Sequence, residues 1–144
     1  MIKLFFIFAF MCFTSYGETQ FAQPIPSIDN PRQIIFSIVA GDDEAINHVL
    51  STANNVLKFY GPENVEMEIV AYSKGIRALL KTEKEISVRV KALMQYEVKF
   101  VACGNTMQTK NIQPSQLIEG SEIVTAGVVE LIERIRSGST YIRP

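Results

Sequence analysis

EVKFVACGNTM, at residues 97–107, joins a strand pattern directly to a helix pattern and guides the interpretation of the whole chain. Val98 to Cys103 is a short apolar run of strand length, and the Gly-Asn pair that follows interrupts it. We expect Thr106 to Lys110 to form one or two helical turns. Cys103 is therefore predicted at the carboxyl end of a strand, immediately before a helix.

The same succession of strand and helix recurs along the chain. Residues 33–40 (QIIFSIVA) are almost fully apolar without strict alternation, which is typical of a strand covered on both faces, as in a parallel sheet. In residues 64–72 (NVEMEIVAY) apolar and acidic positions alternate at the start, which puts Glu66 and Glu68 on one face of a second strand. Shorter strands are predicted over residues 122–126 and 140–142.

Helical periodicity separates these strands. The clearest stripe recurs every three or four residues between Ile46 and Tyr60, with Gly41-Asp42-Asp43 supplying an N-cap and Gly61-Pro62 as the stop. Further helices are predicted over about residues 76–81, 88–94 and 127–135. Alternating strands and helices predict a single α/β domain, a three-layer α/β/α sandwich around a mainly parallel sheet of about five strands.

The amino terminus has the layout of a secretory signal peptide. Lys3 gives a short positive region, residues 4–13 are unbroken and apolar, and small residues precede a cut after Gly17. We expect cleavage to leave a periplasmic or secreted protein of 127 residues with no stable membrane anchor; the alternative is an uncleaved tethering helix. Residues 18–32, with three prolines, form a leader, and residues 33–144 form the domain.

Charge and motifs exclude several classes of function. With 14 basic and 15 acidic residues the chain has no electrostatic footprint for nucleic acid. His48 is the sole histidine and one cysteine remains after cleavage, so we expect no metal site. The sequence contains no glycine-rich phosphate loop and no nucleophile elbow. We therefore expect neither a metal nor an organic cofactor.

The remaining thiol, Cys103, has two interpretations. Cys12 lies in the predicted signal peptide, so the exported chain has no internal disulfide. A cysteine just before a helix faces unpaired N–H groups that favour the thiolate, and Lys74, after the second strand, would add a positive neighbour. Alternatively, Cys103 is a small apolar residue that packs the end of the strand, because free cysteine is among the most buried residue types.

Several segments resemble one known family. They are residues 100–107 (FVACGNTM), Ile112, residues 124–131 (VTAGVVEL), Asn55 with Leu57, the second strand, and the closing Gly138 and residues 141–144. Together they resemble the DsrE/DsrF-like family of sulfur-relay proteins over most of residues 33–144. The resemblance implies a parallel-sheet α/β domain, assembly into homo-oligomers such as trimers or hexamers, and a cysteine at the position of Cys103 that carries persulfide sulfur.

One departure from the family concerns the loop after the second strand. Many exported relatives have His-Gly there, where this chain has Tyr72-Ser73-Lys74-Gly75. If that histidine assists the thiol in relatives, Lys74 takes over its role here or the role is missing.

Two hypotheses of function follow. In the first, Cys103 accepts sulfur from a donor and passes it to an acceptor; the N–H groups of Asn105 and Thr106 stabilise the charged sulfur, and Gly104 allows a partner to approach. In the second, the protein is a non-enzymatic oligomeric module in which Cys103 is structural and Tyr72, Lys74 and Asn105 contact a small ligand or partner. In either case residues 107–112 are predicted at a subunit interface.

Overall fold

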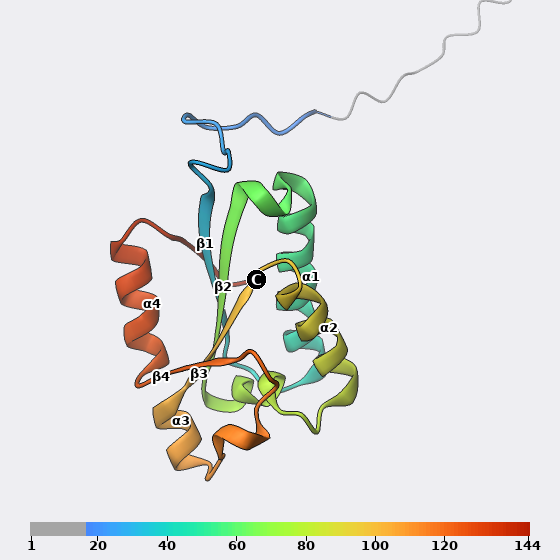
Figure 1. The fold of residues 1–144 in the computed structure, drawn as a ribbon, viewed down its shortest axis with the longest axis vertical. Helices are drawn as coiled ribbons and strands as arrows, with labels where there is room; N and C mark the ends of the chain where they lie inside the picture. Colours follow the sequence, from blue (N-terminus) through green and yellow to red (C-terminus); the bar gives the residue numbers. More distant parts are fainter. Residues whose placement is uncertain (1–16) are drawn as a thin grey trace, which may run out of the picture.

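The computed structural model describes residues 17–144. The predicted signal peptide therefore lies outside the described residues, except for Gly17. Within residues 17–144 no helix is long and apolar enough to cross a membrane. The leader runs along the top of the domain and enters the first strand at Arg32 (Figure 1).

One five-stranded sheet forms the centre of the domain, and every neighbouring pair of strands is parallel. This confirms the predicted α/β class. The strand order is β4-β3-β2-β1-β5, which puts the short C-terminal strand at one edge. The strands are β1 (Arg32–Ile38), β2 (Val65–Ala71), β3 (Lys99–Cys103), β4 (Glu122–Val124) and β5 (Thr140–Ile142).

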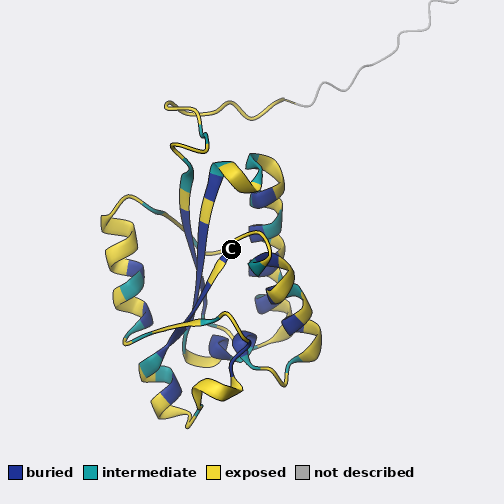
Figure 2. Cartoon of the chain, viewed as in Figure 1, coloured by how far each residue is buried: buried dark blue, intermediate teal, exposed yellow. Residues whose placement is uncertain are grey.

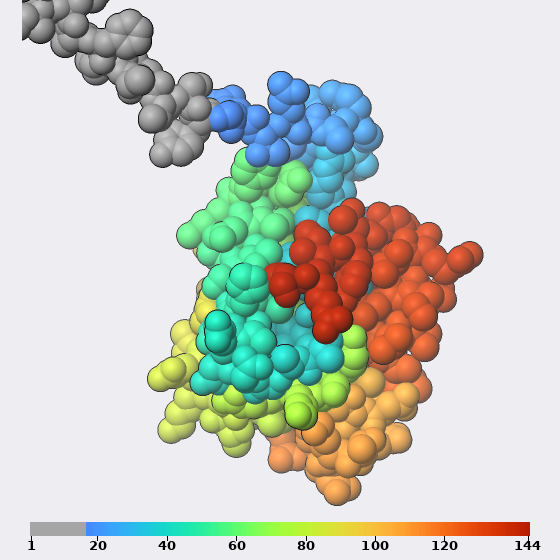
Figure 3. Space-filling view, turned by 180° about the vertical axis from the view of Figure 1, so that it is seen from behind, coloured from blue at the N-terminus to red at the C-terminus, as the bar shows by residue number. Residues whose placement is uncertain are grey.

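Helices cover both faces of the sheet and give the predicted three layers (Figure 1). Helices α1 and α2 lie on one face, and α4 lies alone on the other. Near the C-terminus the chain reaches the surface between α1 and α4 (Figure 3). The helices are α1 (Asp43–Tyr60), α2 (Lys84–Met94), α3 (Gly104–Thr109) and α4 (Gly127–Arg136), with short 3₁₀ helices η1 (Pro62–Asn64), η2 (Ser73–Leu79) and η3 (Pro114–Gln116).

Local signals account for both ends of α1. The Asp42 side chain accepts a hydrogen bond from the backbone N–H of Ala45 at 2.8 Å, as expected of an N-cap. At the other end Gly61 adopts a positive φ of 82° and donates its N–H to the carbonyl of Leu57. Both predicted ends of the helix are confirmed.

The helix expected over residues 76–81 was wrongly placed: the segment is the 3₁₀ helix η2, which begins three residues earlier. Its position follows from a tight contact between Gly75, within η2, and the end of β1. Gly75 donates its N–H to the carbonyl of Val39 at 2.8 Å, and a Cβ at Gly75 would lie 2.1 Å from the carbonyl oxygen of Ile38. The chain therefore turns immediately after β2.

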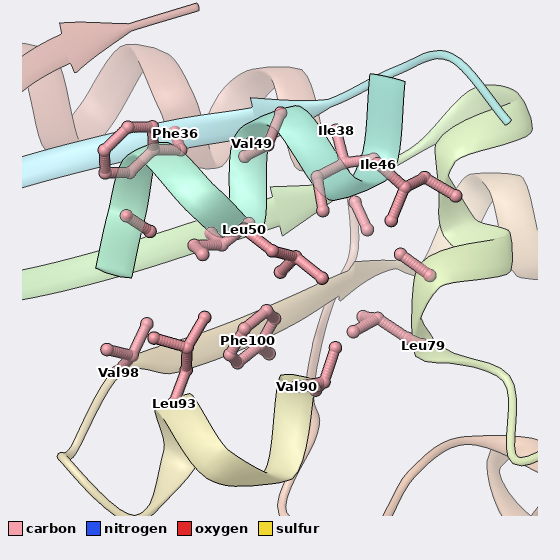
Figure 4. Packing of buried hydrophobic residues seen from close by; sticks show 14 of the residues in the cluster. Phe36, Ile38, Ile46, Val49, Leu50, Leu79, Val90, Leu93, Val98 and Phe100 are labelled. Carbon is pink, nitrogen blue, oxygen red and sulfur yellow. The ribbon is translucent and has the colours of Figure 1, made fainter. Parts of the chain in front are cut away.

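The main core lies between the sheet and helices α1 and α2. Phe36 from β1 and Phe100 from β3 are fully buried, and Leu50 and Val90 approach them from the two helices (Figure 4). The inner sides of both helices are buried and their outer sides exposed (Figure 2). This face contains most of the buried apolar surface and stabilises the domain.

The core on the α4 face is much smaller. Its buried members are Ile35, Val70 and Val101 from the three central strands and Leu131 from α4. The continuous apolar run of β1 is thus explained, because Ile35 faces α4 while its neighbours face α1. The outer side of α4 leaves apolar side chains exposed, namely Val128, Val129, Ile132 and Ile135.

Candidate functional site

Cys103 is the last residue of β3, and two helices begin beside it. Helix α3 begins at the next residue, Gly104, and α4 begins at Gly127. A Cβ at Gly127 would lie 3.1 Å from the Cβ of Cys103 and 3.0 Å from Cγ1 of Val70. A larger residue at Gly127 would therefore push α4 away from the sulfur. The Cys103 residue itself is only 6% exposed.

The surroundings of Cys103 favour its thiolate. Burial raises the pKa of Cys103, but hydrogen bonding to the Thr106 side chain and to the backbone groups of Gly127, Thr106 and Asn105 lowers it by more. The net result is a pKa below the ordinary value of a cysteine thiol. Partly unpaired N–H groups at two helix starts thus face one sulfur atom, which is an arrangement suited to an anion.

Thr106 connects the thiol loop with the loop after β2. Its Oγ1 accepts a hydrogen bond from the N–H of Ser73 at 3.1 Å, which leaves the hydroxyl proton available for the sulfur of Cys103. Ser73 reaches this position with a positive φ of 55°, a conformation uncommon for residues other than glycine. This hydrogen bond therefore links the segment after β2 to the segment after β3 beside the thiol.

Gly104 and Asn105 connect the thiol loop with the end of β4. A Cβ at Gly104 would lie 2.9 Å from the carbonyl oxygen of Val124. The segment that packs closely against this glycine is therefore β4 of the same chain. Asn105 donates its N–H to the carbonyl of Thr125 at 3.0 Å, and this N–H also contributes to the environment of Cys103. The Asn105 residue is exposed.

The structure separates the two other predicted site residues. Tyr72 is half-buried beside the thiol, where it packs on the small core under α4. Lys74 is not among the groups that shift the pKa of Cys103; it lines a separate hollow with Gly41 and Lys110. Tyr72 therefore lies on the same side of the sheet as Cys103, near Gly127, whereas Lys74 lines the other hollow.

Sequence reasoning did not assign a site role to Gly127 or Ser73. The sequence correctly predicts a helix that starts at Gly127, but the contact of Gly127 with Cys103 joins residues 24 positions apart in the sequence. The sequence signal that could have indicated this contact is the glycine itself, a small residue at the start of the helix that follows β4. Within residues 17–144 no three histidine, cysteine, aspartate or glutamate side chains are grouped so as to hold a metal ion.

Comparison with known proteins identifies the family. The model of the DsrE/DsrF-like family matches residues 33–144. The chain belongs to this family. Among curated proteins none matches it.

Solved structures support the same assignment. A protein of unknown function, MTH1491 from Methanobacterium thermoautotrophicum, is 31% identical; the match covers 78% of this chain and 99% of that chain, with a TM-score of 0.74. The ychN protein from E. coli has the same fold at 20% identity, with 76% and 96% of the two chains covered and a TM-score of 0.67. Membership of the DsrE/DsrF-like family indicates a function related to sulfur relay.

Proposed function

We propose that this protein carries sulfur as a persulfide on Cys103. The observation that supports this most directly is the position of the sulfur between the starts of α3 and α4, where hydrogen bonding brings the thiol pKa below its ordinary value. A thiolate is the nucleophile in sulfur transfer, so a larger thiolate fraction speeds loading near neutral pH. The family of the chain points to the same chemistry.

The loading step is a thiol exchange on a persulfide donor. The Cys103 thiolate attacks the outer sulfur of a donor R–S–SH, a new S–S bond forms, and the bond within the donor breaks. The donor leaves as the thiolate R–S⁻, and Cys103 becomes the persulfide Cys–S–SH. Atoms and electrons balance without an oxidant, and the N–H groups around the sulfur stabilise the charge before attack.

Sulfur loading of the purified protein tests this proposal. Wild type and Cys103→Ser are incubated with a persulfidated donor or with thiosulfate and examined by intact-mass spectrometry. We expect wild type to gain the mass of one sulfur atom, reversibly with a reductant, and Cys103→Ser to gain none. Equal loading of the two proteins, or no loading of wild type by either donor, would contradict the proposal.

The second candidate is a binding module with a structural cysteine, and the 6% exposure of Cys103 is the observation that favours it. A thiol-labelling experiment separates the two. A carrier thiol reacts with iodoacetamide in the native protein near neutral pH, whereas a structural thiol reacts only after unfolding. Tyr72 and Asn105 would then serve as ligand contacts without any covalent step.

We also propose that the protein is a homo-oligomer, a trimer or hexamer, in which α4 is covered. The exposed Val128, Val129, Ile132 and Ile135 form an apolar surface on that helix, and such surfaces mark interaction sites. In the stretch 107–112, Met107 is buried in the main core, which leaves residues 108–111 exposed for a contact. Sedimentation of wild type and Ile132→Lys is the test: we expect the variant to be smaller, and a monomeric wild type would refute the assembly.

Export by a cleaved signal peptide remains a separate proposal, and it rests on the sequence of residues 1–17. Intact mass of the protein from the envelope fraction tests it. Retention of the amino-terminal residues would rule out cleavage after Gly17.

A further inference from the structure

A second hollow lies at the carboxyl ends of β1 and β2, on the side of the sheet that carries α1 and α2. Its volume is about 550 Å³, which is in the range of small-molecule sites. Three separate segments form it: the β1–α1 loop with Gly41, the 3₁₀ helix η2 with Lys74, and the segment after α3 with Lys110. In open α/β sheets, ligands bind outside the carboxyl ends of the strands.

The base of this hollow is apolar. Ile76 is 2% exposed and belongs to the main core, and Leu80 and Ile112 pack partly buried against it. The hollow therefore offers an apolar surface that is continuous with the main core.

Arg77 lines one wall of the hollow, and two carboxylates balance its positive charge. The guanidinium group binds Asp43 and Glu83 at 2.6 Å each and donates to the carbonyl of Gly41 at 2.8 Å. These contacts connect η2 with the starts of α1 and α2. Arg77 thus stabilises the arrangement of these segments and is not free to bind a ligand anion.

Unlike Arg77, the two lysines of the hollow, Lys74 and Lys110, have no carboxylate partner among residues 17–144. Asp42 is the one carboxylate that lines the hollow, and its side chain accepts the N–H of Ala45 as the cap of α1. The other carboxylates nearby, Asp43 and Glu83, are paired with Arg77. Positive charge is therefore in excess on the lining itself.

We propose that this hollow, the lysine pocket, binds a small organic anion. Its acidic group would lie between Lys74 and Lys110, and its apolar body would lie against Ile76, Leu80 and Ile112. Lysine is suited to this role because its ammonium group makes charge-assisted hydrogen bonds to carboxylate, sulfonate or phosphate oxygens. No covalent step is involved.

The lysine pocket is distinct from the thiol site. Cys103 packs beside Gly127 under α4, whereas the base of the pocket belongs to the core under α1 and α2. Thr106 lies between the two sites: its carbonyl accepts the N–H of Lys110, and its hydroxyl accepts the N–H of Ser73. Binding in the pocket therefore does not require the thiol and does not depend on the proposed sulfur chemistry.

Titration with benzoate tests the pocket, and benzamide is the neutral probe of the same shape. At constant ionic strength we expect benzoate, but not benzamide, to produce saturable NMR shift changes at the amides of Gly41 and Ile76. The double variant Lys74→Gln/Lys110→Gln should weaken benzoate binding at least about tenfold, because hydrogen bonds to charged groups are the stronger ones. Lys84→Gln/Lys91→Gln removes the same charge from exposed positions on α2 and should bind as wild type does.

Cys103→Ser provides the remaining comparison, and it should bind benzoate like wild type. The proposal is overturned if benzoate causes no saturable shift, if benzamide binds equally well, or if the two lysine double variants behave alike. Loss of binding in Cys103→Ser would contradict the independence of the two sites. A failure of sulfur loading leaves each of these results unchanged.

Discussion

On one side of the sheet, two helices bury a large core that includes Phe36 and Phe100; on the other, α4 contributes one buried leucine and leaves four apolar side chains exposed. The α4 side also contains two buried groups that can carry a charge, the thiol of Cys103 and the carboxylate of Glu68. The large core and the candidate site thus lie on opposite faces of the sheet. A site under a lightly packed helix can open without disturbing the main core, since local opening follows local contact density.

Replacing one residue on each face of β3 gives the largest expected contrast. Phe100→Ala on the α1/α2 side should cost about 3–5 kcal/mol of unfolding free energy, the usual range for a buried phenylalanine. Val101→Ala, its neighbour on the α4 side, removes less volume from a smaller cluster and should cost well under half of that. Urea denaturation measures both. Equal costs would show that the two faces contribute alike.

Gly127→Ala tests whether α4 must sit close to the sulfur. The new methyl group would meet Val70 Cγ1 at 3.0 Å and Cys103 Cβ at 3.1 Å, so α4 must shift. Overpacking of this kind costs about 1–3 kcal/mol. The same shift should withdraw the Gly127 N–H from Cys103 and raise the pKa of the thiol, which the pH dependence of iodoacetamide labelling measures.

Gly138→Ala serves as the comparison for that variant. Gly138 has open space at its Cβ position but a positive φ of 111°, so alanine there introduces backbone strain without touching the thiol. We expect lower stability with unchanged labelling. Identical labelling profiles for Gly127→Ala and wild type would contradict the role of the helix start.

Thr106→Val should change the chemistry of the thiol more than the stability of the domain. It removes the hydroxyl that lowers the pKa of Cys103, so the pKa rises and labelling near pH 7 slows. Thr106→Ser keeps the hydroxyl and should behave like wild type. Because wild-type Cys103 has a lowered pKa, its thiolate also contributes stability above the pKa of the unfolded thiol. That contribution is lost as the pH falls through the folded-state pKa, and it should shrink in Thr106→Val.

The smallest expected effect concerns Glu68, which lies buried under α4. Burial raises the pKa of Glu68, although Arg134 at 3.1 Å opposes the shift, and Oε1 has no hydrogen-bond partner among the described residues. In the folded protein, Glu68 therefore stays protonated up to a higher pH than it does in the unfolded chain. This contribution to stability is present at low pH and is lost as the pH rises through the folded-state pKa.

Glu68→Gln should abolish that part of the pH dependence, as measured by urea denaturation between pH 4 and pH 8. Its neighbour on the same strand and face, Glu66, is exposed, and Glu66→Gln is the matched control. We expect the control to retain the wild-type slope. A wild-type slope in Glu68→Gln would show that the carboxylate is as well solvated as an exposed one.

Much of the fold could be predicted because its signals are local. The stripe between Ile46 and Tyr60 and the caps Asp42 and Gly61 specify α1 to within a few residues. The alternation in β2 correctly put Glu66 and Glu68 on the face opposite the main core. The segment after β2 was misplaced because its start depends on Gly75 of η2 fitting against Ile38 of β1, and these two residues are far apart in the sequence.

The sequence by itself determined the order of strands and helices, the family, and the position of Cys103 at the end of a strand, since propensity, periodicity and motif are properties of neighbouring residues. Only the tertiary structure decided which groups surround the sulfur. Thr106, three residues after Cys103, and Gly127, far from it in the chain, meet at the sulfur, while Lys74 lines a separate hollow. The physical reason is that the packing of α4 and η2 against the sheet fixes these contacts, and that packing depends on residues distant in sequence.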